Sequence, residues 1–170
     1  GVRETTMKKL LLALAAGAMA LTASAAMAQD KLTLQLKWVT QAQFAGYIVA
    51  KAKGFYSDEK LDVTILPGGP NVAPEQVIAG GGADIIVDWM GGAAAARDKG
   101  VPLVNIAQPF KRSGLELICP KENNINTVAD FKGKTLGVWF FGNEYPFFAW
   151  MNKEGLSTAE GGDVKVLQQS

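Results

Sequence analysis

Histidine is absent from this sequence of 170 residues, and cysteine occurs once, as Cys119. The lack of histidine removes the most frequent general base and the most frequent metal ligand of proteins. A single cysteine forms no internal disulfide, so the folded chain must depend on its hydrophobic core. The sequence also lacks a charge excess, with 17 basic and 16 acidic side chains. It therefore gives no electrostatic reason to expect a nucleic acid or an anionic membrane surface as a partner.

The first 28 residues have the pattern of a secretory signal peptide. Met7-Lys8-Lys9 precedes an uncharged run over residues 10–21, and small residues follow up to Ala28. The uncharged run is shorter than the roughly 20 residues of a membrane-spanning helix. We expect translation to start at Met7 and cleavage after Ala28, giving a soluble periplasmic protein that begins at Gln29. Because residues 1–28 hold three basic and one acidic side chain, the net charge of the mature chain becomes −1.

Short β-type runs alternate with helical runs along the mature sequence. The alternation predicts a parallel sheet with helices on both faces. A polar stretch over residues 120–130 resembles a crossover, after which the alternation restarts but contains only two strands. Two strands and one helix do not bury both faces of a sheet, so we expect the sequence to be a fragment of a longer polypeptide. Strands are expected over residues 32–38, 61–66, 84–88, 103–107, 115–119, 135–139 and 164–167, and helices over 44–53, 74–79, 92–99 and 146–153.

These patterns divide the chain into three parts. Residues 1–28 are the upstream residues and signal peptide, residues 29–119 form a first α/β lobe, and residues 120–170 form the crossover and a partial second α/β lobe.

Three strand-to-helix turns combine aromatic rings with hydrogen-bonding groups. In open parallel sheets, ligands bind beyond the carboxyl ends of the strands, where helix N-termini offer unpaired N–H groups. Aromatic rings beside polar groups are typical of a pocket for a flat, polar small molecule. The candidate ligand-binding residues are Trp38, Gln41, Phe44 and Tyr47 in the first turn, Asp88 and Trp89 in the second, and Asn143 and Glu144 in the third.

Each candidate also has a purely structural interpretation. The aromatic candidates can fill the hydrophobic core, as large aromatic residues often do. Asp88 or Asn143 can cap the helix that follows it, and Glu144 suits the first turn of its own helix. The glycine runs at residues 68–69 and 80–82 lack the spacing of a phosphate-binding loop and predict turns instead.

Several motifs occur in an order that resembles one protein family. They are Leu34–Tyr47 (LQLKWVTQAQFAGY), Ala50–Tyr56 (AKAKGFY), Gly82-Ala83-Asp84, Asp130–Lys134 (DFKGK) and Gly142–Pro146 (GNEYP). Together they resemble the opening of ABC-transporter solute-binding proteins of the thiamine-pyrimidine-precursor class, which is related to the sulfonate, nitrate and taurine binders. The resemblance implies a type II periplasmic-binding-protein fold of two doubly wound lobes, the second incomplete here. It also implies ligand capture between the lobes, delivery to an ABC permease in the inner membrane, and no cofactor.

The nature of the ligand follows from the charge of the candidate residues. Anion binders present N–H groups and cationic or hydroxyl side chains, whereas these turns offer Asp88 and Glu144 beside tryptophans. A planar heterocycle with amino groups, such as an aminopyrimidine, suits them better than an anion. A flavin or another small nutrient, such as a sulfonate, nitrate or taurine, remains an alternative.

Two other classes of protein share this type of fold. Yeast-type relatives of the family look like pyrimidine-forming enzymes, but that chemistry needs a histidine and a cysteine-rich metal motif, which the sequence lacks. A transcriptional effector domain would follow a helix-turn-helix instead of a signal peptide. We therefore expect a binding protein without enzymatic activity, cofactor or metal, monomeric when full length.

Overall fold

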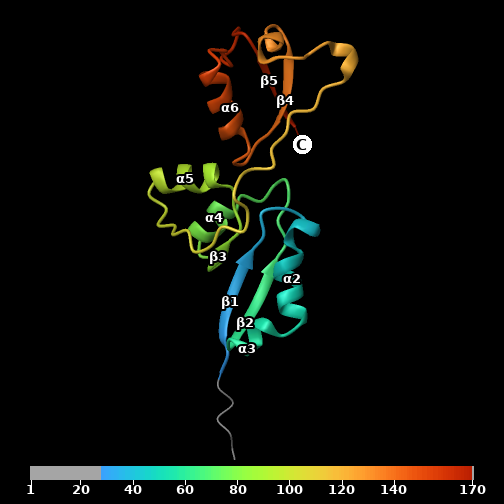
Figure 1. The fold of residues 1–170 in the computed structure, drawn as a ribbon. Coiled ribbons are helices and arrows are strands. Elements are labelled where there is room, and N and C mark those ends of the chain that lie inside the picture. The colour runs from blue at the N-terminus through green and yellow to red at the C-terminus, as the bar shows by residue number, and fades with distance from the viewer. Residues whose placement is uncertain (1–27, 170) are drawn as a thin grey trace, which may run out of the picture.

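The computed structural model describes residues 28–169, which form a mixed α/β structure with two parallel sheets (Figure 1). The predicted signal peptide, apart from Ala28, lies outside the described residues. No helix within residues 28–169 has both the length and the apolar character needed to cross a membrane.

The first sheet has the strand order β2-β1-β3. Strand β1 (Asp30–Gln35) pairs with β2 (Leu61–Leu66) along its full length and with β3 (Ile85–Ile86) at its carboxyl end. Because all three strands are parallel, their carboxyl ends lie at the same edge of the sheet. The connecting helices are η1 (Ala42–Phe44), α2 (Ala45–Ala52) and α3 (Phe55–Asp58) before β2, α4 (Pro74–Ala79) before β3, and α5 (Met90–Asp98) after it.

The carboxyl end of β1 is buried on both faces, as expected for a central strand of a parallel sheet. Leu34 and Leu36 join Phe44 and Val63 in the core of this sheet. On the opposite face, the buried Gln35 side chain donates hydrogen bonds to the carbonyls of Leu36 and Pro67. The next residue on the Gln35 face is Lys37, which is also buried.

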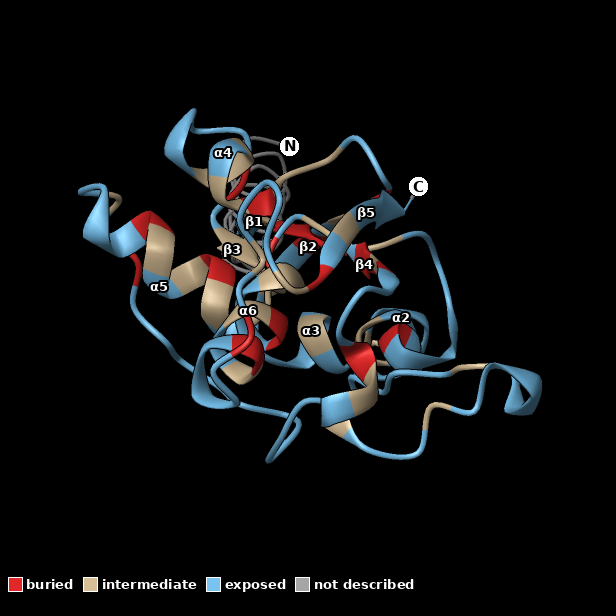
Figure 2. Ribbon diagram, turned by 90° about the horizontal axis from the view of Figure 1, so that it is seen from above, coloured by how far each residue is buried: buried red, intermediate tan, exposed pale blue. Residues whose placement is uncertain are grey.

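The second sheet pairs β4 (Thr135–Trp139) with β5 (Lys165–Gln169). Helix α6 (Glu144–Lys153) packs on this sheet through Phe147 and Met151, which are four residues apart and share one face of the helix. Figure 2 colours the buried residues of the chain red. Short 3-10 helices, η2 (Lys121–Asn123) and η3 (Val128–Phe131), lead into β4. The core of this sheet is Phe131, Leu136, Val138, Phe147, Met151, Leu156 and Val164.

The strands predicted over residues 103–107 and 115–119 are wrong. Neither segment pairs with another strand of the described part of the chain. Leu103 is buried, but most of the other apolar side chains are exposed, with Val104 78% and Ile118 88% accessible. A strand needs a neighbouring strand to satisfy its backbone hydrogen bonds, and an apolar run does not supply one. The predicted strand over residues 84–88 shortens to two residues for a related reason, since β1 pairs with only Ile85 and Ile86.

Candidate functional site

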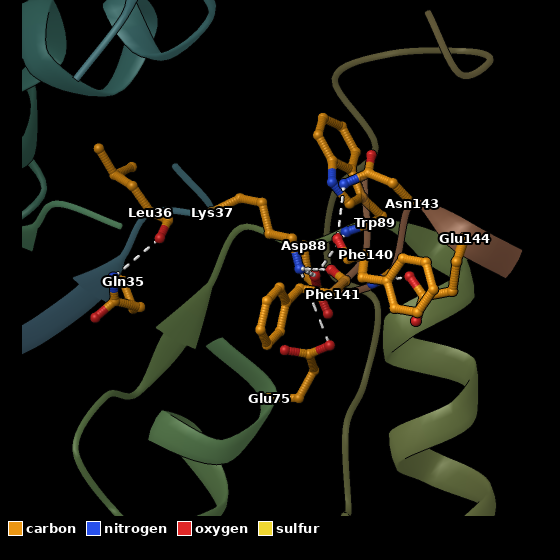
Figure 3. Close-up of polar contacts among 11 residues, drawn as sticks. Gln35, Leu36, Lys37, Glu75, Asp88, Trp89, Phe140, Phe141, Asn143 and Glu144 are labelled. Carbon is orange, nitrogen blue, oxygen red and sulfur yellow. Dashed lines mark hydrogen bonds and ion pairs between the residues drawn. The ribbon is translucent and has the colours of Figure 1, made fainter. Parts of the chain in front are cut away.

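The three aromatic-rich turns meet at the carboxyl ends of β1, β3 and β4 (Figure 3). Lys37, just after β1, places its Nζ 2.7 Å from Oδ1 of Asp88, just after β3. The same Nζ donates a hydrogen bond of 2.5 Å to the carbonyl of Phe141, just after β4. Beside this contact, Trp38 and Trp139 pack edge to face with their ring centroids 5.5 Å apart. Segments about 50 residues apart in sequence thus build one site.

A buried charge cluster, made of Lys37, Glu75 and Asp88, lies at the centre of this site. The side chains of Lys37 and Asp88 are each 4% exposed and that of Glu75 is 16% exposed. Oε1 of Glu75 lies 4.0 Å from the Lys37 Nζ, so two carboxylates share one ammonium group. Oδ2 of Asp88 and Oε2 of Glu75 are buried without a hydrogen-bond partner within residues 28–169. Unpartnered buried polar atoms are rare in proteins and often mark functional sites.

Burial raises the pKa of Asp88 above its ordinary value. The neighbouring carboxylate of Glu75 adds to this increase, while the hydrogen bond and charge of Lys37 and the hydrogen bond from the Trp89 N–H oppose it. Desolvation is the largest of these effects, and the charge of Glu75 acts in the same direction.

The contribution of Asp88 to the free energy of unfolding should therefore fall as the pH rises from 3.8, the ordinary pKa of aspartate, to the raised pKa of Asp88. Over this interval the folded protein holds a proton that the unfolded chain has released. In urea unfolding at several pH values, the free energy of unfolding of the wild type relative to that of Asp88→Asn should decrease over this interval. Asp130→Asn is a control in which the pH dependence of the free energy of unfolding should change in the opposite direction. Hydrogen bonds from the backbone of Asn126 and Thr127 lower the pKa of exposed Asp130. An unchanged pH profile in Asp88→Asn would contradict the prediction.

Glycines let the backbone approach the charge cluster closely. A Cβ at Gly92, in the first turn of α5, would lie 2.6 Å from Oε1 of Glu75 and 3.3 Å from Oδ2 of Asp88. Gly142 has a φ of +102°, and a Cβ there would lie 3.5 Å from the Gly92 backbone and 3.5 Å from the Lys37 Nζ. Residues 140–143, which we call the β4–α6 loop, therefore lie directly against the start of α5.

Most candidates in the second and third turns take part in local hydrogen bonds. Trp89 is half-buried at the N-cap of α5, and its N–H donates to Oδ1 of Asp88 at 2.8 Å. Asn143 donates from its side chain to the Phe140 carbonyl at 3.2 Å. Oε2 of Glu144 accepts a hydrogen bond of 2.7 Å from the Gly142 N–H. Ligand contact by these residues stays a prediction.

Three candidates from the first turn lie apart from the charge cluster. Phe44 is 3% exposed in the core of the first sheet. Tyr47 is half-buried against that core, and burial raises the pKa of its hydroxyl. Gln41 is exposed and accepts a hydrogen bond from the Gln43 side chain at 3.2 Å. No ion pair or hydrogen bond within residues 28–169 joins these three side chains to the cluster. The contacts described above bring together Trp38, Asp88, Trp89 and the residues after β4.

The sequence interpretation missed Lys37 and Glu75. A signal for Lys37 exists, because it continues the alternation of the buried strand and shares the face of Gln35. Glu75 follows Pro74 in the first turn of α4, where a carboxylate also has an ordinary role in stabilising a helix. Within the described residues, no group of three or more Cys, Asp or Glu side chains is arranged to hold a metal ion.

Comparison with known proteins identifies relatives of the chain. Residues 41–168 match the family described as NMT1/THI5 like. The chain is 33% identical over 110 residues to a 4-amino-5-hydroxymethyl-2-methylpyrimidine phosphate synthase of Legionella pneumophila, covering 64% of this chain and 34% of that protein. It is 29% identical over 117 residues to a formylaminopyrimidine-binding protein of Halalkalibacterium halodurans, covering 68% and 35%.

A third relative and a solved structure extend the comparison. The riboflavin-binding protein RibY of Chloroflexus aurantiacus is 25% identical over 135 residues, covering 77% of this chain and 38% of that protein. The chain therefore spans about a third of the length of these relatives. The crystal structure of a lipoprotein from Actinomyces odontolyticus is similar in fold, with a TM-score of 0.50 at 12% identity over 83% of this chain and 62% of that one.

Proposed function

Because the chain belongs to the NMT1/THI5 like family, we propose that it is part of a solute-binding protein that captures a small planar heterocycle bearing amino groups. The observation that carries this proposal is the meeting of the three turns, joined by the contacts of Lys37 with Asp88 and with the Phe141 carbonyl. The names of two relatives, a formylaminopyrimidine-binding protein and a riboflavin-binding protein, are consistent with a ligand of this kind.

The chemistry of the charge cluster favours an amino group over an anion. Oδ2 of Asp88 and Oε2 of Glu75 lack donors within the described part of the chain, and an amino group supplies N–H donors. With two carboxylates to one ammonium group, the cluster repels a sulfonate or nitrate ion. In the proposal, the half-buried indoles of Trp38 and Trp89 stack on the planar ring of the ligand.

Transport is the process in which this binding takes part. In the proposal, the ligand lies between a first lobe that contains β1 and a second that contains β4, and closure of the lobes traps it for an ABC permease. Export through the signal peptide, a periplasmic location and a monomeric state when full length belong to the same proposal.

An enzyme that forms a pyrimidine is the second candidate function. It is favoured by one observation, the similarity to a pyrimidine phosphate synthase. The sequence contains no histidine to act as a general base. Incubation of the protein with candidate precursors separates the two functions, because a binding protein returns its ligand unchanged.

Calorimetric titration of the full-length protein with an aminopyrimidine, riboflavin, taurine and nitrate tests the proposal. An amino heterocycle should bind and change the tryptophan fluorescence. Trp89→Ala should weaken that binding by about 1 to 3 kcal/mol, the range for a base stacked on an aromatic side chain. Trp150→Phe serves as a control, because Trp150 packs on Phe131 in the second core.

A second variant separates ligand contact from a local structural role. Glu144→Gln should weaken binding by about 1.5 to 3 kcal/mol if Glu144 accepts from the ligand, and should leave affinity almost unchanged if Glu144 serves only the Gly142 N–H. Binding of nitrate or taurine, strengthened by removal of this negative charge, would contradict the amino-heterocycle proposal.

A further inference from the structure

Two contacts, made by the neighbouring residues Lys37 and Trp38, join the carboxyl ends of β1 and β4. The Lys37 ammonium donates to the Phe141 carbonyl at 2.5 Å, and Trp38 packs edge to face on Trp139. One contact is polar and the other apolar. Both connect the first sheet to the segment that carries Asn143 and Glu144.

Lys37 is anchored firmly on the side of the first sheet. Its side chain is 4% exposed, and its Nζ lies 2.7 Å from Oδ1 of Asp88. An ammonium group has three N–H donors, so the ion pair leaves others free to reach the β4–α6 loop. A hydrogen bond from an ionised donor is shorter and stronger than one between neutral groups.

The β4–α6 loop has a backbone that needs such support. Phe141 has a φ of +62°, one of three positive values among the non-glycine residues of the described chain. An aromatic residue in this region is strained, and the strain persists only where the surroundings hold it. Phe141 is 44% exposed, so packing holds this residue only in part. The carbonyl of this same residue accepts the Lys37 hydrogen bond.

Fixing Phe141 also fixes the residues that follow it. The next N–H, that of Gly142, donates to Oε2 of Glu144, and Asn143 donates back to the Phe140 carbonyl. These short-range bonds make the loop and the start of α6 one unit. Figure 3 shows Lys37 reaching from the end of β1 to this unit, with Asp88 and Glu75 around its ammonium group.

We propose that Lys37 is a positioning residue, which holds the β4–α6 loop on the carboxyl ends of β1 and β3 before any ligand arrives. Glu75 and Asp88 are the buried counter-charges that keep its ammonium group in place. The inference builds on the proposed function. In that function, Lys37 preorganises Asn143 and Glu144 for ligand capture and so reduces the free-energy cost of ordering them on binding.

Hydrogen–deuterium exchange on the full chain without ligand tests this role. Lys37→Met should speed exchange of the amides of residues 141–144 about 10-fold or more, the effect of losing a hydrogen bond to a charged donor. Lys51→Met is the matched control, because the Lys51 Nζ donates to the Val63 carbonyl at 2.6 Å within the first sheet. This control should leave exchange in residues 141–144 at the wild-type rate.

A second variant covers the case in which Lys37→Met fails to fold. The triple variant Lys37→Met, Glu75→Gln, Asp88→Asn removes all charge from the cluster, so it avoids buried unpaired carboxylates but still lacks the ammonium donor. It should retain slow exchange in β1 and β2 and show the fast exchange in residues 141–144. Wild-type exchange rates there in the triple variant would overturn the proposal.

Titration with an aminopyrimidine and with riboflavin separates this inference from the proposed function. If the wild type binds one of them, Lys37→Met, which keeps Asp88 and Glu75, should bind it about 10-fold more weakly, because its loop is no longer preorganised. Equal affinity in both would overturn the role in capture. If the wild type binds neither, the proposed function fails, while the exchange result still decides whether Lys37 positions the loop.

Discussion

Replacing Lys37 by methionine is expected to lower the free energy of unfolding by about 3 to 5 kcal/mol, the usual cost of removing one partner from a buried ion pair. The variant leaves the buried carboxylates of Asp88 and Glu75 without their cation. Two of their oxygens already lack partners within residues 28–169, so little nearby is available to compensate. Urea unfolding near neutral pH measures the loss.

Two further variants show whether charge burial causes the loss. Lys51→Met removes another lysine-to-carbonyl hydrogen bond and should cost only about 1 kcal/mol. Adding Glu75→Gln and Asp88→Asn to Lys37→Met should restore most of the stability, because a neutral cluster has no unpaired buried charge. A Lys37→Met protein as stable as the wild type would show that the carboxylates are not ionised against a buried ammonium.

Elements bounded by local signals could be predicted from the sequence. The limits of β2, α4 and β4 agree with the predicted ranges 61–66, 74–79 and 135–139. Proline at the first position of α4 and glycine after its last residue mark that helix within the segment itself. Alternation and composition define the two strands in the same way, without reference to distant residues.

Elements that depend on distant partners could not be predicted in the same way. Residues 103–107 have the composition of a strand, but no strand of the described chain pairs with them, and Val104 and Ile106 are exposed. Residues 115–119 likewise pair with no strand of the described chain, and Ile118 is exposed. Composition indicates what a segment can form, whereas pairing decides what it forms.

The candidate site was predicted in outline but not in its central residues. The rule that ligands bind at the carboxyl ends of parallel strands placed Asp88 and the residues after β4 correctly at one location. It did not identify Lys37 and Glu75, because their importance comes from packing between β1, α4 and α5. For Phe44, the apolar pattern left open which face of the helix turns inward, and the structure places this residue in the core.

Replacing Phe147 by alanine is expected to destabilise the second core by about 3 to 5 kcal/mol, as is typical of a buried phenylalanine. Phe147 lies on α6, is 3% exposed and belongs to the core that this helix forms with β4. Its ring packs on Phe148 at a centroid distance of 5.6 Å. Asn152→Ala, on the exposed side of the same helix, should change stability by no more than about 0.5 kcal/mol. Denaturant unfolding of the two variants measures the difference.

The same variant tests the predicted boundary between residues 29–119 and 120–170. The cores around Leu34 and around Phe147 share no buried residue, so the two regions should open separately. In Phe147→Ala, amide exchange should become faster in β4 and β5, and the rates in β1 and β2 should stay near those of the wild type. Faster exchange of equal size in all four strands would instead show that both cores unfold as one cooperative unit, and the predicted boundary would be wrong.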